Sequence, residues 1–261
     1  MARAHLIMAT RPKNALLGVT GIAIFLIAWE IAGRRLGAGL LAPPSLVAAE
    51  YLTLLRQGEM LRELAFSLRQ MAIGFLLACA IGMPLGAVMG RSRIAEAIFQ
   101  PWVSMFVVTS TAALIPLLIM FVGTGLLLRV TIVFLASVWY IVLTTYNGAR
   151  GINPQLIAAA RSFSASPLQI LAKIVLPALY PYLLTGARIG LVHAIRAMVM
   201  AEMFVIIGYG GLVHRSGLLV DTSQLLGLLL TLMIISLVFN WLLRQAAHRL
   251  APWYEQQRVT L

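Results

Sequence analysis

The sequence predicts an all-α membrane protein with six transmembrane helices, and three observations lead to this fold class. Of its 261 residues, 61% are hydrophobic and 11% are charged, and the mean hydropathy is +0.94. Soluble domains carry about 25% charged residues, so the composition excludes a soluble or a disordered chain. The apolar residues fall in blocks of about 20, the length an α-helix needs to cross a bilayer. A single cysteine, Cys79, excludes a disulfide scaffold.

Six apolar blocks predict the membrane-spanning helices, and together they make the whole chain, 1–261, one transmembrane domain. The predicted helices cover residues 15–32, 70–90, 101–122, 126–148, 182–207 and 225–243. The uncharged stretch 97–128 is too long for one crossing, so the third and fourth helices are predicted to turn at Gly123-Thr124-Gly125. The first block follows basic residues, but no clear small-residue cleavage site comes after it, so an uncleaved helix is predicted.

The distribution of Arg and Lys predicts how these helices are oriented. With the N-terminus inside, twelve basic residues lie on the inner side or its boundary and seven on the outer. The positive-inside rule therefore places both termini in the cytoplasm. The net charge of +12 agrees with basic loops drawn to the anionic headgroups of the lipid bilayer. No Lys/Arg cluster with interleaved aromatic residues is present, so no nucleic-acid partner is predicted.

Two connections between the predicted helices are long. The outer one, 33–69, contains Leu41-Ala42-Pro43-Pro44-Ser45 and then a polar, helix-like stretch over 45–57. In the inner one, 148–181, Asn153-Pro154 and Ser166-Pro167 each place a capping side chain before a proline at the first helical position. Gln169 completes a capping box with Ser166, and Pro177 is predicted to end the second of two short helices.

The inner connection is rich in small residues, which let another surface approach closely. It is either a knob that docks to a separate subunit or a connector that lies on the surface without a partner. The chain has no phosphate-binding loop of the form G-x-x-x-x-G-K-[ST], so it is predicted not to be an ATPase.

This connection resembles the EAA loop of ABC importer permeases, whose pattern is E-A-A, three residues, G, nine residues, I, one residue, L-P. Leu176-Pro177 and Ile174 match its end, and Ala159-Ala160 match the two alanines. Ala158 stands where the glutamate is usual, and Ser164 stands where the glycine is usual. Over roughly residues 40–250, further similar motifs are Leu41-Ala42-Pro43-Pro44-Ser45, Gly82-Met83-Pro84-Leu85-Gly86, Ile115-Pro116-Leu117-Leu118, Gly123-Thr124-Gly125, Leu183-Leu184-Thr185-Gly186-Ala187-Arg188 and Ala201-Glu202.

The resemblance implies the type I ABC importer permease fold, with residues 149–181 as the cytoplasmic coupling loop. The branch that is most similar carries sulfonates, taurine, nitrate and related small anions. The resemblance implies a multi-pass protein of the bacterial inner membrane that forms a homodimer with two ATPase subunits and receives its substrate from a periplasmic or lipid-anchored binding protein. ATP and Mg would bind to the ATPase, and this chain itself would need no cofactor. The resemblance assigns ATPase contact to Ala158, Ala159, Ala160, Arg161, Ser164, Ala165, Ile174, Leu176 and Pro177.

Several polar residues fall inside predicted helices, where a charge costs at least about 2.5 kcal/mol on insertion scales. His193 and Arg196 are three residues apart, so they share a face that could give an anionic substrate a positive site. Alternatively, Arg196 pairs with Glu202 or with another helix, and His193 has a structural role. Glu202 matches the family and is a further candidate for the transport pathway, with a structural or gating role predicted for it. Thr109, Ser110 and Thr111 could contact substrate or satisfy backbone carbonyls.

Two other classes of function stay open. A self-sufficient secondary transporter or channel would take up substrate without any ATPase. An intramembrane enzyme would use His193 and Glu202 as acid and base, but no nucleophile or metal set supports it, so no catalytic residue is predicted. The four histidines are too scattered for a metal site. Gly82, Gly86 and Gly90 recur every four residues, a spacing that predicts close helix packing, or less readily a hinge.

Overall fold

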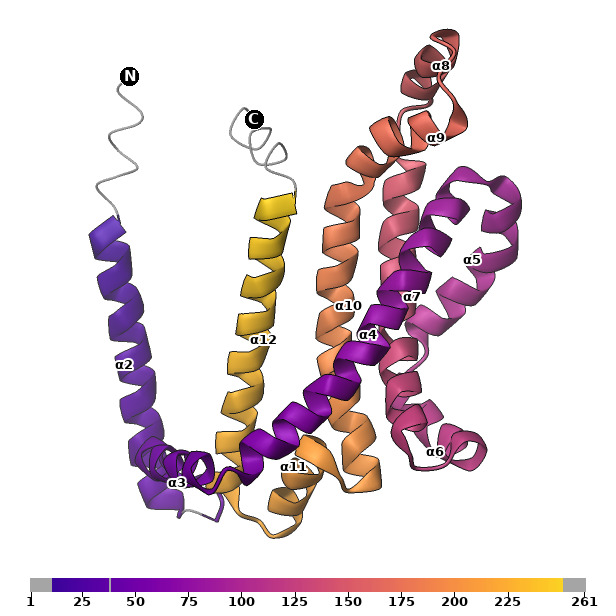
Figure 1. Cartoon of the computed structure of the whole chain (residues 1–261). Helices are drawn as coiled ribbons and strands as arrows, with labels where there is room; N and C mark the ends of the chain where they lie inside the picture. The colour runs from indigo at the N-terminus through magenta and orange to yellow at the C-terminus, as the bar shows by residue number, and fades with distance from the viewer. Residues whose placement is uncertain (1–10, 38, 251–261) are drawn as a thin grey trace. The chain divides into compact units, whose positions relative to one another are not determined.

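The computed structural model describes residues 11–37 and 39–250, and in these residues it contains helices and no strands (Figure 1). The elements are α2 (Arg11–Leu36), α3 (Pro44–Gln57), α4 (Glu59–Arg91), α5 (Arg93–Val108), α6 (Thr111–Val122), α7 (Leu126–Arg150), α8 (Pro154–Ser162), α9 (Pro167–Ile170), the π-helical η1 (Leu171–Val175), α10 (Leu176–Val205), α11 (Gly208–Leu218) and α12 (Thr222–Leu250). Five helices are long and apolar enough to cross a membrane, and the bent pair α5–α6 is a further candidate span. The all-α membrane fold with five to six spans follows. The predicted cytoplasmic termini fall on residues 1–10 and 251–261, which lie outside the described residues.

The chain divides into two compact units, of which one comprises residues 1–61 and 212–232 and the other residues 62–211 and 233–261. In the first unit, the start of α3 is fastened to the end of α2. Glu30 accepts hydrogen bonds from the backbone N–H and the hydroxyl of Ser45 at 3.1 and 2.8 Å, and the Trp29 indole donates to the Ala42 carbonyl at 3.1 Å. Gly33 faces Pro43 so closely that a Cβ would lie 2.8 Å from its Cα. The predicted helix over 45–57 is confirmed as α3.

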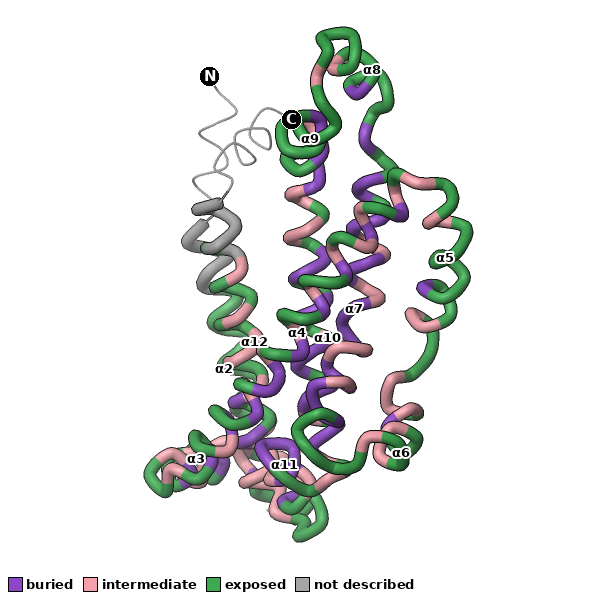
Figure 2. Tube along the Cα trace, turned by 45° about the vertical axis from the view of Figure 1, so that its right-hand side comes forward, coloured by how far each residue is buried: buried purple, intermediate pink, exposed green. Residues whose placement is uncertain are grey.

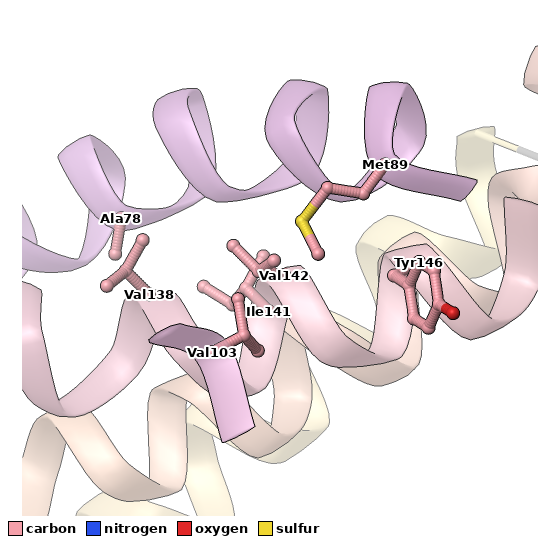
Figure 3. Close-up of a cluster of buried hydrophobic side chains, with 7 residues drawn as sticks. All are labelled: Ala78, Met89, Val103, Val138, Ile141, Val142 and Tyr146. Carbon is pink, nitrogen blue, oxygen red and sulfur yellow. The ribbon is translucent and has the colours of Figure 1, made fainter. Parts of the chain in front are cut away.

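In the second unit, α7 is the central helix, and the buried residues concentrate along it (Figure 2). A cluster of buried side chains from α4, α5 and α7 forms one part of the core (Figure 3). Glycines of α4 make this packing close. A Cβ on Gly86 would lie 2.5 Å from the Val142 carbonyl oxygen, and one on Gly90 would lie 2.4 Å from the Ala149 Cβ. The prediction that the four-residue glycine repeat serves close helix packing is therefore confirmed.

The predicted single helix over 101–122 is wrong. The structure has two helices there, α5 and α6, which are bent by 103° at Thr109 and Ser110. The Thr109 hydroxyl donates to the Met105 carbonyl at 2.8 Å, and Ser110 has an extended backbone as the N-cap of α6. Hydroxyl side chains favour such helix ends over helix interiors, because they offer the backbone a competing partner.

Pro177 does not end the second helix of the inner connection, contrary to the prediction. The chain passes from α9 through η1 directly into α10, so the helix that was predicted to begin at residue 182 begins at Leu176, and the candidate span extends over Pro167–Val205. Pro177 is the second residue of α10 and follows η1 without a break, so the helical path continues through it although proline has no N–H to donate to the preceding turn. The junction itself is the π-helical turn η1, a form that is rare outside single turns within helices. Similarly, α4 starts at Glu59 instead of residue 70. The prediction used only the apolar stretch, and the helix also includes the more polar residues that precede it.

Candidate functional site

The coupling loop, residues 149–181, is built from two capped helices joined by a tight turn. The Asn153 side chain accepts from the Gln155 N–H at 2.9 Å and caps α8. Both hydrogen bonds of the predicted capping box between Ser166 and Gln169 are present, at 2.9 and 3.3 Å, so these two helix starts are confirmed. Ile157 and Ile170 are buried under the loop.

The turn between α8 and α9 shows why glycine is usual in its middle. Ser164 has a φ of 56°, in the left-handed region that L-residues rarely adopt. The Ser164 N–H bonds the Arg161 carbonyl at 2.9 Å, and the Ala165 N–H bonds the Ala160 carbonyl at 3.1 Å. Glycine would adopt this conformation without steric cost, so Ser164 is a strained replacement.

The predicted loop residues lie on one projecting structure. Ala158, Ala159, Ala160 and Arg161 belong to α8, Ser164 and Ala165 to the turn, Ile174 to η1, and Leu176 and Pro177 to the start of α10. Ala158, Ala159 and Arg161 are exposed, and Phe163 is 86% exposed. Two hollows flank the turn. One, of about 260 Å³, includes Phe163 and Lys173 in its lining, and the other, of about 430 Å³, includes Arg91 and Arg161.

A second feature, which we call the polar pocket, lies where the α5–α6 bend faces α7 and α10. It is a cavity of about 250 Å³. Five of the six predicted pathway residues line it, namely Thr109, Ser110, Thr111, His193 and Arg196. The bend brings the first three to the cavity, and the i, i+3 spacing on α10 brings the other two.

Aromatic side chains of α7 support the polar pocket. The rings of Tyr140 and His193 stack with centroids 3.7 Å apart, and the Tyr140 hydroxyl donates to the Val107 carbonyl at 3.3 Å. The rings of Phe106 and Trp139 stack at 4.6 Å. Neither Trp139 nor Tyr140 was among the site residues predicted from the sequence. Their position one residue apart, in the middle of an apolar helix, was the available signal, since aromatic residues with polar atoms inside a bundle need a partner.

The hydroxyls and charges at this pocket are suited to an anion. Ser110 is the N-cap of α6 and its hydroxyl makes no capping bond, so the first N–H groups of α6 have no side-chain cap. The positive end of the helix dipole and the exposed Arg196 guanidinium therefore lie on the same cavity. In the part of the chain that the structure describes, no three His, Cys, Asp or Glu side chains come together as a metal site requires.

Glu202, the sixth predicted pathway residue, does not line the polar pocket. It is 1% exposed and accepts a hydrogen bond from the Gly210 N–H at 2.8 Å. Its basic neighbour is Arg129 of α7, not Arg196, so the predicted pairing of Arg196 with Glu202 is wrong. The two are six positions apart along α10, which puts them on different faces of the helix. Arg129, one of the seven basic residues that the sequence places on the outer side or its boundary, is 7% exposed and therefore buried within the protein.

Comparisons with known proteins agree with this architecture. The family described as binding-protein-dependent transport system inner membrane component matches residues 82–256. A probable ABC transporter permease protein of Brucella abortus (strain 2308) is 34% identical over 248 residues, which cover 93% of this chain and 99% of that protein. The taurine transport system permease protein TauC of Escherichia coli (strain K12) is 28% identical over 250 residues, which cover 93% of this chain and 91% of TauC.

A solved structure is similar in fold. It is a chain of the MetNI methionine ABC transporter in inward facing conformations, with a TM-score of 0.60 and 24% identity, covering 77% of this chain and 96% of that chain. The family match covers more than half of the chain, and it decides the class of protein together with the shared fold. The chain belongs to the family of binding-protein-dependent transport system inner membrane components, and it is a membrane-spanning permease of the ABC transporter class.

Proposed function

We propose that this permease carries a small organic or inorganic anion, such as a sulfonate, taurine or nitrate, through the polar pocket. The observation that carries the proposal is the meeting of Arg196, His193 and the uncapped start of α6 on one cavity. Such a cavity stabilises negative charge, and the residues that line it include no acidic side chain that would compete with the anion for these groups. The relative of this permease in Escherichia coli, TauC, is named for the transport of taurine, a sulfonate, and this supports the same class of substrate.

The coupling loop is the proposed contact with the ATPase. Its exposed small residues permit close approach by the ATPase surface. Because both short helices are capped, the loop can move with the ATPase while its helices stay folded. Arg91, Arg161 and Lys173 around the two hollows favour an acidic rim on the partner. Because Ala158 replaces the usual glutamate, the docking helix carries no acidic side chain of its own over α8.

The proposed complex contains two copies of this chain, two ATPase subunits that bind ATP and Mg, and a periplasmic or lipid-anchored binding protein. Binding of ATP favours one conformation of the ATPase pair and shifts the population of the permease towards the corresponding state. The chain is not an enzyme in this arrangement. Its loop 149–181 and both termini lie in the cytoplasm of a bacterium, on the inner side of the inner membrane.

A tagged pull-down from gently solubilised native membranes tests the assembly. Mass spectrometry of the co-purifying chains should find an ATPase in equal amount, and uptake into vesicles should require ATP. Recovery of the chain alone, with uptake intact without ATP, would overturn the importer proposal in favour of a secondary transporter.

A crosslinking experiment tests the docking site. With Cys79→Ala as background, Ala160→Cys should form a crosslink with the co-purifying ATPase. Met120→Cys is the control, because Met120 is 83% exposed on α6, at the other end of α7 from the coupling loop (Figure 1). Capture of the ATPase by Met120→Cys but not by Ala160→Cys would refute the assignment of the loop.

A further inference from the structure

Two charged side chains are buried in the described part of the chain, and they lie together. Glu202 of α10 is 1% exposed and Arg129 of α7 is 7% exposed. α7 and α10 pack along each other (Figure 1), and each of these two charges acts electrostatically on the other. Intramembrane charges are costly enough that their retention indicates a function.

Each charge lies at the unfavourable end of its own helix. Arg129 is in the first turn of α7, where the helix dipole is positive, and Glu202 is in the last turn of α10, where it is negative. Neither residue therefore stabilises its own helix. Each is instead suited to stabilise the other, because the charges are opposite and the helices are packed against each other.

Their hydrogen bonds are nevertheless incomplete. Oε2 of Glu202 accepts from the Gly210 N–H, while Oε1 has no hydrogen-bond partner among the described residues. Nε and Nη1 of Arg129 also have none there, and its guanidinium carbon lies 5.1 Å from the centroid of the Phe66 ring. Two free donors and one free acceptor thus match, although no direct ion pair joins them.

The carboxylate of Glu202 is also enclosed by the turn that leaves α10. Ile206 has a φ of 58° and Gly208 a φ of 68°, and a Cβ on Gly208 would lie 2.5 Å from Oε1 of Glu202. The next residue, Tyr209, donates its N–H to the Ser67 hydroxyl of α4 at 2.9 Å. A shift of the turn 206–210 would therefore break the Gly210 bond and uncover the carboxylate.

We infer that Glu202 and Arg129 act as a switchable charge pair, in which the carboxylate holds the turn 206–210 in the state described here and bonds the Arg129 guanidinium directly in another state of the transport cycle. The inference rests on the proposed ATP-driven function. It makes both residues positioning residues for the turn, with no contact to the transported anion. The direct pair compensates the lost Gly210 bond and stabilises the second state.

A double-mutant cycle in the complete importer tests the pair. With Cys79→Ala as background, Ile207→Cys reports on the turn through its rate of maleimide labelling, with and without a non-hydrolysable ATP analogue. Glu202→Gln and Arg129→Gln should each reduce the population of the nucleotide-driven state about tenfold, and the double variant should be reduced no further than either single one. Arg129→Lys, which keeps the charge, should retain most of the response. Arg188→Gln is the matched control, because Arg188 is an exposed arginine of α10.

Reductions that multiply to about a hundredfold in the double variant would show independent roles and overturn the inference. The inference would also be overturned if Arg129→Gln left the nucleotide response unchanged while Glu202→Gln abolished it. In that case the role of Glu202 would be limited to its hydrogen bond with Gly210. A second reporter, Val108→Cys in the lining of the polar pocket, distinguishes failure of the charge-pair inference from failure of the proposed ATP-driven function. If neither reporter responds to nucleotide in the parent protein, the ATP-driven function itself fails, and the inference fails with it.

Discussion

Arg196 is the charged side chain of the polar pocket, and its role can be tested at the scale of one residue. Arg196→Gln keeps most of the side-chain volume and removes the charge. Since Arg196 is exposed and makes no ion pair among the described residues, assembly should be unchanged. Uptake of the anion should fall at least about tenfold, the loss expected for one charged hydrogen bond.

Uptake by membrane vesicles containing equal amounts of assembled complex checks this prediction. Arg188→Gln serves again as the control, because it removes an exposed charge from the same helix away from the pocket lining. Unchanged transport by Arg196→Gln would exclude a role for this charge in the pathway.

Ser164 is strained by its left-handed backbone. Ser164→Gly should remove a steric cost of about 1 kcal/mol, and it restores the residue that the family pattern has at this position. Thermal unfolding in detergent should show a higher midpoint. Ser162→Gly is the comparison, because Ser162 lies in α8 and glycine should destabilise that helix. A midpoint for Ser164→Gly at or below that of the parent would contradict the strain.

At the scale of elements, close contact between α4 and α7 depends on the absence of side chains on the glycines. Gly86→Ala would place a Cβ 2.5 Å from a backbone oxygen, which cannot move as a flexible side chain could. It should cost about 1–3 kcal/mol of stability. Gly217→Ala, with open space around its Cβ, should be neutral or slightly stabilising. Denaturation in mixed micelles compares the two, and equal stabilities would argue against the close packing.

The start of α12 has a capping carboxylate with a definite pH dependence. Asp221 accepts from the Gln224 N–H at 3.0 Å and from the Ser223 hydroxyl at 2.7 Å, and these bonds lower the pKa of Asp221. Asp221→Ala should destabilise the protein by about 1 kcal/mol at neutral pH. Because the folded pKa is lower than the unfolded one, the stabilisation is present above about pH 4 and is lost as the pH falls further.

Unfolding of parent and Asp221→Ala between pH 7 and pH 3 measures this difference. The gap between them should narrow below about pH 4. A gap that stays constant over the whole range would mean that the charged form of Asp221 is not what stabilises the helix.

At the scale of the whole molecule, the topology can be tested through two ends of one span. α6 precedes α7 and the coupling loop follows it, so a single crossing by α7 puts them on opposite sides of the membrane (Figure 1). In right-side-out spheroplasts, an impermeant maleimide should label Met120→Cys and should not label Ala160→Cys. After the cells are lysed, the same reagent should label Ala160→Cys. Labelling of Ala160→Cys from outside would invert the proposed orientation.

Several features could be predicted from sequence because they depend on neighbours along the chain. Apolar blocks of bilayer length identified the spans, Asn153 and Ser166 identified the starts of α8 and α9, and the four-residue repeat identified the packing face of α4. These devices work within one or two helical turns, so no knowledge of other helices is needed. The order of motifs likewise led to the family before any contact was known.

Only the tertiary structure decided which polar groups meet. At Ser110 the chain bends, and at Pro177 it continues as a helix. In both places the alternative conformations, a helix end or a continued helix, differ by little free energy, so the sequence alone does not choose between them. The partner of Glu202 depends on how α7 packs on α10, because a buried charge takes whichever opposite charge the packing presents. Residues 73 positions apart cannot be paired from spacing alone, so the sequence determined the class of the protein and the packing determined where its charges act.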